Sequence, residues 1–363
     1  MSSARDHAMV TGMPFFDAHC DTISKLYAGE GDIAADSVGA GLHVTLPGLR
    51  RAGVRAQVFA LWAWEGAYGA DTTEVALALA DELHRVCAVH AEDLSLVLTA
   101  RDLERVSAQA GRVAVIAGLE GADALLGRPE EIETFFARGV RLLTLAWGDN
   151  PFCGSVFQGG GGLTATGREL VEACESLGVV VDASHASDEA FSDLCRSATK
   201  PFIASHSNCR SICPNERNLT DQMIRSLADR GGVMGINLGS SFLSAVSCAR
   251  TRRFRDEFFH RVGSGHSGFV DAQRASASAQ ALLPRPPLAL VVDHVKHAID
   301  VGGEDCVGLG GDLDGVKSLP EGLDGVGDYP RIAQLLLDGG LNPRQVEKVC
   351  FKNFARVFVD LLP

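Results

Sequence analysis

Several polar side chains that could bind a metal ion follow short apolar runs in this sequence. The stretch FFDAHCDTI, residues 15–23, begins apolar and then places His19 and Asp21 two positions apart. Four further apolar runs end in the same manner, and their terminal polar residues are Glu120, His185, His206 and Asp312. Histidine and carboxylate side chains are ordinary protein ligands of zinc, so the set as a whole predicts a metal site.

Each of these residues alone has a simpler explanation, because the end of an apolar strand often meets water. His185 or His206 taken singly would be interpreted as a hydrogen-bonded structural histidine. The metal hypothesis depends on all six residues meeting at one place. In a parallel barrel the carboxyl ends of the strands converge on one mouth, where the active site lies. Three carboxylates buried there together would be unfavourable without a cation.

The spacing of His19 and Asp21 indicates how one ion would be bound. Residues i and i+2 of a strand lie on one face, so both side chains would point to the same ion. Cys20 between them would point away into the packing, although a role as nucleophile or ligand stays open.

His185 and His206 follow two consecutive strands, so they would lie side by side and bind a second ion. Glu120 lies between the two groups in barrel order. Because its two carboxylate oxygens can each bind one ion, it is the best candidate for a bridging ligand.

The elements that must position these residues alternate along the chain. Amphipathic segments at 71–90, 164–178 and 219–232 predict helices, the last two with threonine caps and glycine ends. Near-continuous apolar runs are typical of parallel strands covered on both faces. The eight runs are MPFFDAH, VRAQVFALW, VAVIAGLE, VRLLTLAW, GVVVDASH, PFIASH, GGVMGINLG and CVGLGGD.

Eight strands separated by helices predict an α/β protein with a closed (β/α)8 TIM barrel, in preference to an open doubly wound sheet. We expect a single domain over residues 1–363. The stretch around 263–287 is rich in Gly, Ser, Ala and Pro and predicts an insertion before the last strand–helix unit.

Charge and composition argue against several classes of protein. The net charge of −13 argues against binding nucleic acid or an anionic membrane surface. No apolar run is long enough to span a bilayer, and the N-terminal residues lack a signal-peptide pattern, so we expect a cytoplasmic protein. The 10 cysteines favour reduced, buried thiols over a disulfide framework. A serine or cysteine hydrolase is disfavoured because the sequence has no G-x-S-x-G elbow or Cys–His motif.

Taken in order, the motifs make the chain resemble the renal or membrane dipeptidase family of amidohydrolase-like metal barrels. The resemblance covers almost the whole chain, and the ordered set is specific where any one motif would be weak. The motifs are FFDAHCDT, HVTLPGLRRAGVRAQVFALW, GLEGAD, VVVDASHAS, ASHSNCRSICPNERNL, VGLGGDLDGV and NFARVF.

The resemblance implies two zinc ions per chain. His19 and Asp21 match the ligands of one ion, and His185 and His206 match those of the second. Glu120 matches the carboxylate that bridges them.

The resemblance also implies a zinc dipeptidase that hydrolyses free dipeptides, including those with a C-terminal D-residue. Asp312 would be the general base and acid beside a hydroxide that bridges the metals. Arg217, in NERNL, would hold the carboxylate of the dipeptide. Without the resemblance, Arg217 would be interpreted as a surface ion pair just ahead of a helix.

Trp147 departs from the family pattern. The mammalian members end the fourth strand in Thr-Leu-Thr-His, whereas this chain has TLAWGDN, with Trp147 in the place of the histidine. The indole N–H could donate one hydrogen bond, or the ring could form an apolar wall of the substrate site. Substrate preference is therefore open.

Two other functions stay open on the sequence. One is a different metal-dependent amidohydrolase, acting on an N-acyl amino acid or a lactone. The other is a barrel that keeps its metal for structure or binding, without catalysis. A small dipeptide is the expected partner, and a homo-oligomer is compatible with the sequence.

Four further polar residues are interpreted as supporting ones. Asp17 would orient the ligands or be a hydrogen-bonded acid, and Asp314 would support Asp312. His294 and His297, one helical turn apart, would be a surface or supporting pair on the last helix.

Overall fold

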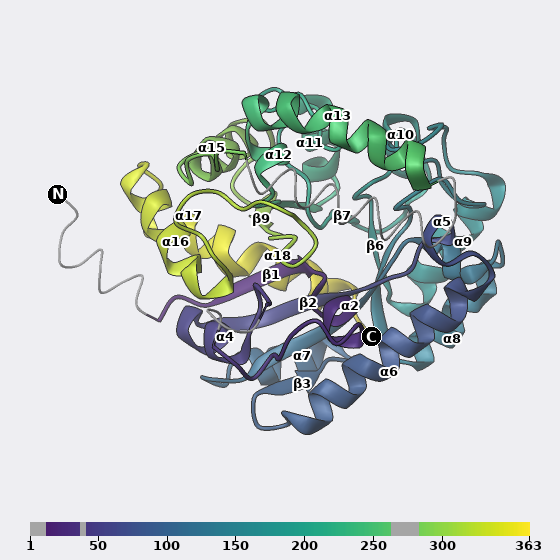
Figure 1. Cartoon of the computed structure of the whole chain (residues 1–363), viewed down its shortest axis with the longest axis horizontal. Coiled ribbons are helices and arrows are strands. Elements are labelled where there is room, and N and C mark those ends of the chain that lie inside the picture. The colour runs from purple at the N-terminus through teal and green to yellow at the C-terminus, as the bar shows by residue number, and fades with distance from the viewer. Residues whose placement is uncertain (1–11, 37–40, 263–282) are drawn as a thin grey trace.

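Nine parallel strands form one sheet, and helices surround it (Figure 1). The computed structural model describes residues 12–36, 41–262 and 283–363. The strand order is β2-β1-β9-β8-β7-β6-β5-β4-β3, and β2 also pairs with β4. The strands are β1 (Phe15–Cys20), β2 (Val54–Trp62), β3 (Leu94–Leu96), β4 (Val113–Glu120), β5 (Val140–Thr144), β6 (Val180–Asp182), β7 (Ile203–Ala204), β8 (Val233–Ile236) and β9 (Val307–Leu309).

The pairing of β2 with β4 closes eight of the strands into a barrel, so the predicted (β/α)8 fold is confirmed. The ninth strand, β3, was not predicted from the sequence. It pairs with the first residues of β4, from Val113 to Val115, whereas β5 pairs with β4 only from Ala117 onward. A three-residue strand at such an edge is too short to produce a clear sequence pattern.

Five strands, β5 to β9, end earlier than the sequence predicted, and three of them carry expected site residues. β6 ends at Asp182, β7 at Ala204 and β9 at Leu309, so His185, His206 and Asp312 lie on the loops that follow. The backbone explains two of these cases, because His185 has φ 68° and Asp312 has φ 54°. These left-handed values are incompatible with a strand. All three residues still lie beyond the carboxyl ends of their strands.

The predicted helices begin and end at recognisable signals. In α9 the Thr164 side chain accepts a hydrogen bond from the Gly167 N–H, and Gly178 ends the helix with φ 77°. Thr220 caps α11 in the same way. The helices are α2 (Thr22–Tyr27), α4 (Leu46–Ala52), α5 (Glu65–Tyr68), α6 (Thr72–Val89), α7 (Ala100–Ser107), α8 (Ile132–Ala137), α9 (Ala165–Leu177), α10 (Asp188–Ser197), α11 (Asp221–Asp229), α12 (Ser240–Leu243), α13 (Ala245–Val262), α15 (Leu290–Gly302), α16 (Tyr329–Asp338), α17 (Pro343–Glu347) and α18 (Asn353–Leu361).

The interior of the barrel is apolar at one end. Phe16 lies in one buried cluster with inward-facing residues of the other strands and with Phe354 and Phe358 of α18. The ring centroids of Phe16 and Phe358 are 5.2 Å apart. Burying each phenylalanine contributes roughly 1.5–3 kcal/mol. This packing leaves the carboxyl ends of the strands as the end of the barrel that carries polar side chains.

Part of the predicted insertion, residues 263–282, lies outside the described residues. The insertion and the single-domain organisation therefore stay predictions. Within the described ranges, every helix is too short or too polar to cross a bilayer. The cytoplasmic location also stays a prediction.

Candidate metal centre

A polar and aromatic layer crosses the barrel interior at the carboxyl ends of four adjacent strands. Trp62 of β2 is in register with Glu120 of β4, Glu120 with Thr144 of β5, and Thr144 with Asp182 of β6. Residues in register on parallel strands project to the same side of the sheet. The predicted ligands meet next to this layer, at the carboxyl ends of the strands.

The two oxygens of the Glu120 carboxylate lie between two groups of histidines. Its Oε2 is 3.5 Å from His19 Nε2. Its Oε1 is 3.2 Å from His185 Nε2 and 3.8 Å from His206 Nε2. Glu120 is 3% exposed, so the carboxylate is almost completely enclosed. A carboxylate with one oxygen toward each group has the arrangement required of a bridging ligand.

His19 and Asp21 approach each other as predicted, but for a different reason. Their Nε2 and Oδ2 atoms are 3.4 Å apart. The register of β1 shifts between Asp17 and Cys20, and Asp21 is the residue before α2 instead of a strand residue. The alternation of an ideal strand therefore does not apply here. The irregular backbone at the end of β1 brings the two side chains together.

His206 is oriented by a short chain of hydrogen bonds. The Asp182 Oδ2 accepts a hydrogen bond from Ser205 Oγ at 2.6 Å, and Ser205 Oγ lies 2.7 Å from His206 Nδ1. Since the hydroxyl proton goes to the carboxylate, the hydroxyl oxygen accepts from Nδ1–H. This tautomer leaves the Nε2 lone pair of His206 facing Glu120 and available to a metal.

Asp312 lies beside Asp21 at the other side of the centre. Its carboxylate accepts a hydrogen bond from Asn237 Nδ2 at 2.7 Å. His19, Asp21 and Asp312 form a group whose ligand atoms lie within 4.8 Å of one another. Gly315 has no room for a side chain because both carboxylates occupy that space. The loop is therefore shaped closely around these acids.

The charges in this cluster are strongly interdependent. Burial lowers the pKa of His19, but Glu120, Asp21 and Asp312 raise it to about 10. Burial raises the pKa of Glu120 well above its ordinary value and, with Asp21, raises that of Asp312 to about 7. The protein on its own therefore attracts protons to this site.

His185 and His206 have the opposite tendency. The pKa of each histidine lies well below its ordinary value. Burial is the main cause, and the positive charges of His19 and Arg217 lower the pKa further. Both rings are therefore neutral near pH 7, which is the form that binds metal.

The residues fit a divalent metal site. His19 Nε2 is buried without a hydrogen-bond partner, although it faces carboxylates. Cations at the centre would offset the mutual repulsion of buried Glu120, Asp21 and Asp312 and would use the nitrogen lone pairs. The donor set, three histidines and carboxylates without a cysteine, is normal for zinc.

Arg217 is buried instead of forming a surface ion pair. It is 3% exposed, and its Nη1 donates to Ser207 Oγ at 2.6 Å. Its Nε and Nη2 have no hydrogen-bond partner among the described residues. Burial lowers the pKa of Arg217 to about 10, opposed by the charges of Asp182, Asp312 and Glu120. Two unused donors beside the candidate ligands can bind a carboxylate.

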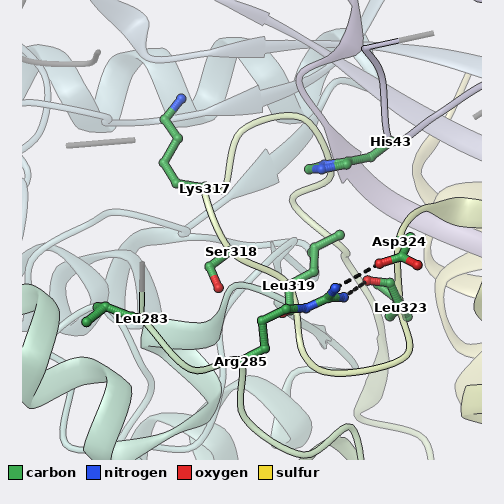
Figure 2. A pocket seen from close by; sticks show the side chains of 8 residues that line it. All are labelled: His43, Leu283, Arg285, Lys317, Ser318, Leu319, Leu323 and Asp324. Carbon is green, nitrogen blue, oxygen red and sulfur yellow. Dashed lines mark hydrogen bonds and ion pairs between the residues drawn. The ribbon is translucent and has the colours of Figure 1, made fainter. Parts of the chain in front are cut away.

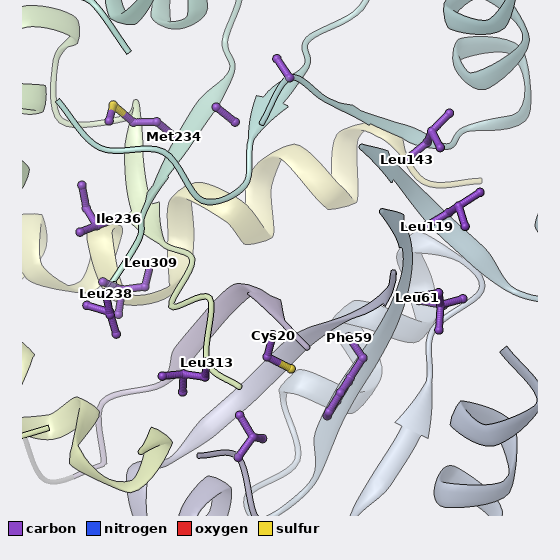
Figure 3. Packing of buried hydrophobic residues seen from close by; sticks show 14 of the residues in the cluster. Cys20, Phe59, Leu61, Leu119, Leu143, Met234, Ile236, Leu238, Leu309 and Leu313 are labelled. Atoms are coloured by element: carbon purple, nitrogen blue, oxygen red, sulfur yellow. The ribbon is translucent and has the colours of Figure 1, made fainter. Parts of the chain in front are cut away.

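Cys20 packs in the core, as expected. Figure 3 shows it among apolar side chains such as Phe59 and Leu313. Burial raises the pKa of its thiol well above the ordinary value. The thiol is therefore unsuited to act as a nucleophile.

The other polar residues singled out in the sequence support loops. Asp17 is buried and accepts hydrogen bonds from the backbone N–H of His19 and of Gly311. Asp314 accepts from Thr22 and from the backbone N–H of His43.

The two histidines of α15, His294 and His297, have different surroundings. His294 is buried, and its Nδ1 accepts from the Cys209 N–H, so it is not a surface residue. His297 pairs with Asp221 at 2.8 Å. Both therefore support the packing of α15.

Figure 2 shows the side chains that line a hollow of about 200 Å³, among them Lys317 of the loop that follows Asp312. Burial lowers the pKa of Lys317 in its lining, and Asp21 and Asp312 are among the charges that act on this lysine. The hollow is lined by His43, Leu283, Arg285, Lys317, Ser318, Leu319, Leu323 and Asp324.

Several contributors to the site were missed in the sequence. Asn237 donates a hydrogen bond to Asp312 and directly follows β8. A search for polar residues at the ends of apolar runs, which identified the candidate ligands, would also have identified Asn237. Ser205 directly precedes His206 and Asp182 lies three residues before His185, so both carry a weaker signal. Trp62 lies inside the apolar run of β2, so its local pattern does not distinguish it from a core residue.

The closed barrel and this cluster place the chain in the class of metal-dependent hydrolases built on (β/α)8 barrels. Within that class the chain belongs to the membrane dipeptidase family, peptidase family M19, whose family model matches residues 3–361. It is thus a member of a family of metallo-dipeptidases.

Two relatives illustrate the similarity in sequence. An uncharacterized protein in the pqqA 5′ region of Klebsiella pneumoniae is 33% identical over 287 residues, which cover 77% of this chain and 93% of that protein. Dipeptidase 3 from Homo sapiens is 29% identical over 298 residues, covering 79% of this chain and 52% of dipeptidase 3. The alignment thus spans about half the length of dipeptidase 3.

Solved structures share the fold. The probable dipeptidase PvdM from Pseudomonas aeruginosa has a TM-score of 0.85 at 18% identity, over 99% of this chain and 98% of that one. A metallo peptidase from Rhodobacter sphaeroides, liganded with a phosphinate mimic of the dipeptide L-Ala-D-Ala, has a TM-score of 0.80 at 24% identity, over 97% and 100%.

Proposed function

We propose that this protein is a zinc-dependent dipeptidase that hydrolyses the peptide bond of free dipeptides, including those with a C-terminal D-residue. The observation that carries the proposal is the Glu120 carboxylate, with one oxygen toward His19 and the other toward His185 and His206. The L-Ala-D-Ala mimic bound by the Rhodobacter sphaeroides relative supports the D-residue.

In this proposal two zinc ions are held by the chain. His19 and Asp21 would hold one ion, His185 and His206 would hold the other, and Glu120 would offer one oxygen to each. When bound, such ions would activate a water molecule near neutral pH and polarise the scissile carbonyl.

Asp312 would move the proton. Its carboxyl, with a pKa near 7 in the chain alone, can accept a proton from the attacking water and pass it to the leaving amine. Asn237 holds one Asp312 oxygen at 2.7 Å and so fixes the direction of the other.

Arg217 would bind the free C-terminal carboxylate through its Nε and Nη2. A bidentate contact at a fixed distance from the metals would select short peptides and orient the scissile bond.

The test is a panel of substrates on zinc-loaded protein. We expect turnover of L-L and L-D dipeptides and little turnover of N-acyl amino acids or lactones. No dipeptide hydrolysis by protein with two bound zinc ions would contradict the proposal. It would favour the amidohydrolase alternative if another substrate were turned over, or a non-catalytic barrel if none were.

A further inference from the structure

Three tryptophans and a phenylalanine gather beside the metal centre. They are Trp62, Trp64, Trp147 and Phe157, here called the aromatic wall. The ring centroids of Trp147 lie 5.3 Å from Trp62, 4.8 Å from Trp64 and 5.7 Å from Phe157. The chain has 3 tryptophans, so all of them belong to this wall.

The wall borders the second pair of ligands. The Phe157 ring lies 5.3 Å from the His185 ring, and the Trp147 ring lies 6.0 Å from it. Trp62 is in register with Glu120, the central carboxylate. The aromatic surface therefore begins at the ligands, on the His185 side of the centre.

Hydrogen bonds fix the loop that carries Trp147 and Phe157. Ser155 Oγ donates to the Trp147 carbonyl at 2.7 Å, and the Val156 N–H donates to the His185 carbonyl at 3.0 Å. Asp149 accepts from the Ser155 N–H at 2.6 Å. The wall and the ligand His185 are thus held together by the same short segment.

Trp64 packs against the ring of Trp147. A side chain at Gly66 or Gly148 would collide with the Trp64 ring, so both positions need glycine for this packing. Trp64 is 3% exposed and Trp62 9%, whereas Trp147 and Phe157 are half-buried. The buried pair supports the two rings that keep an accessible face.

Building on the proposed function, we infer that the aromatic wall is a specificity subsite that takes a large apolar or aromatic side chain of the dipeptide. A rigid aromatic surface adjoining the ligands loses little conformational freedom on binding. Ring–ring contacts there would favour a phenylalanine side chain over a methyl group. Trp147 then acts through its apolar face.

Substrate selectivity tests the inference. The kcat/KM of Phe-Ala and of Ala-Phe, each with an L- or D-residue at the C-terminus, is compared with that of Ala-Ala. We expect a preference of roughly tenfold or more in the Phe-Ala or the Ala-Phe series. Trp147→Ala and Phe157→Ala should each reduce this ratio, mainly through KM.

Trp147→Phe is the matched variant, because it keeps an aromatic face and removes the indole N–H. The ratio should stay within about threefold of the wild-type value if the face is what matters. Zinc content and thermal unfolding are measured for each variant. If Trp147→Ala fails to fold, the kcat/KM ratio of Phe157→Ala is compared with that of the wild type instead.

Intrinsic fluorescence gives a readout independent of turnover. A phosphinate dipeptide mimic bearing a benzyl side chain should change the tryptophan emission more than the alanine mimic at equal saturation. Equal emission changes, or loss of kcat/KM by the same factor for all dipeptides, would overturn the inference. Equal kcat/KM for Ala-Ala, Phe-Ala and Ala-Phe would refute the subsite but leave the proposed function intact. If no dipeptide is hydrolysed, the proposed function itself is refuted.

Discussion

The Nε2 atoms of His185 and His206 lie 2.9 Å apart, although the two residues come from different loops. Two nitrogens bound to one tetrahedral zinc at about 2.0–2.1 Å would be about 3.4 Å apart. The pair needs only a small separation to become ligands of one ion. Left-handed backbone at His185, held by the contact of Val156 with its carbonyl, makes this approach possible.

Metal content should depend on Glu120. Chelator-treated protein should bind two zinc ions per chain in calorimetry, and metal removal should abolish dipeptide hydrolysis. Glu120→Ala should weaken both binding events by about a hundredfold or more, since a bridging ligand serves both ions. Glu74 is an exposed glutamate on α6, so Glu74→Ala is the control variant and should bind two zinc ions. Normal binding of two ions by Glu120→Ala would contradict a bridging role.

Loss of the Asp312 carboxylate should affect the reaction but not the metal. Asp312→Asn should lower kcat by roughly 10²–10⁴, the usual size of a general acid–base contribution. Zinc content by elemental analysis should equal that of the wild type. Asp324→Asn, which alters an exposed aspartate paired with Arg285, should retain activity. Full activity in Asp312→Asn would rule out the proton-transfer role.

Recognition of the substrate carboxylate should depend on Arg217. Arg217→Lys should raise KM by about tenfold or more, because an ammonium cannot form the bidentate contact. Amidated dipeptides should be poor substrates of the wild type. Arg210→Lys, on the same loop but paired with Asp188, should change KM little. Equal rates for free and amidated dipeptides would exclude the clamp.

Asp123 should make stability depend on pH. Burial raises its pKa from 3.8 to about 7. The native state therefore binds more protons than the unfolded state between these values, and stability falls as pH rises through that range. Asp123→Asn removes this titration, so its stability relative to the wild type should rise by about 2–3 kcal/mol between pH 5 and pH 8.

Denaturant unfolding of the two proteins at each pH, at constant zinc, measures this difference. A stability difference that is the same at both pH values would show that the carboxyl does not titrate in this range. Dipeptide hydrolysis by Asp123→Asn reports separately whether the loop around Glu120 is preserved.

Much of the fold could be predicted because local patterns decide it. The apolar runs of β2 and β4 coincide with the observed strands, and Thr164 and Gly178 mark the ends of α9 by their own hydrogen bonds and backbone. β3 could not be predicted, since its three residues are held by the edge of β4 and not by their own sequence.

The sequence by itself determined which residues are available as ligands and that each follows a strand of a parallel barrel. The tertiary structure decided how their atoms meet. The register shift at the end of β1 brings Asp21 to His19, and Arg217 becomes buried with two donors unused. The tryptophans at 62, 64 and 147 become one wall. These outcomes depend on barrel closure and on backbone angles beyond the strands, which join residues far apart in the chain and leave no local periodicity to read.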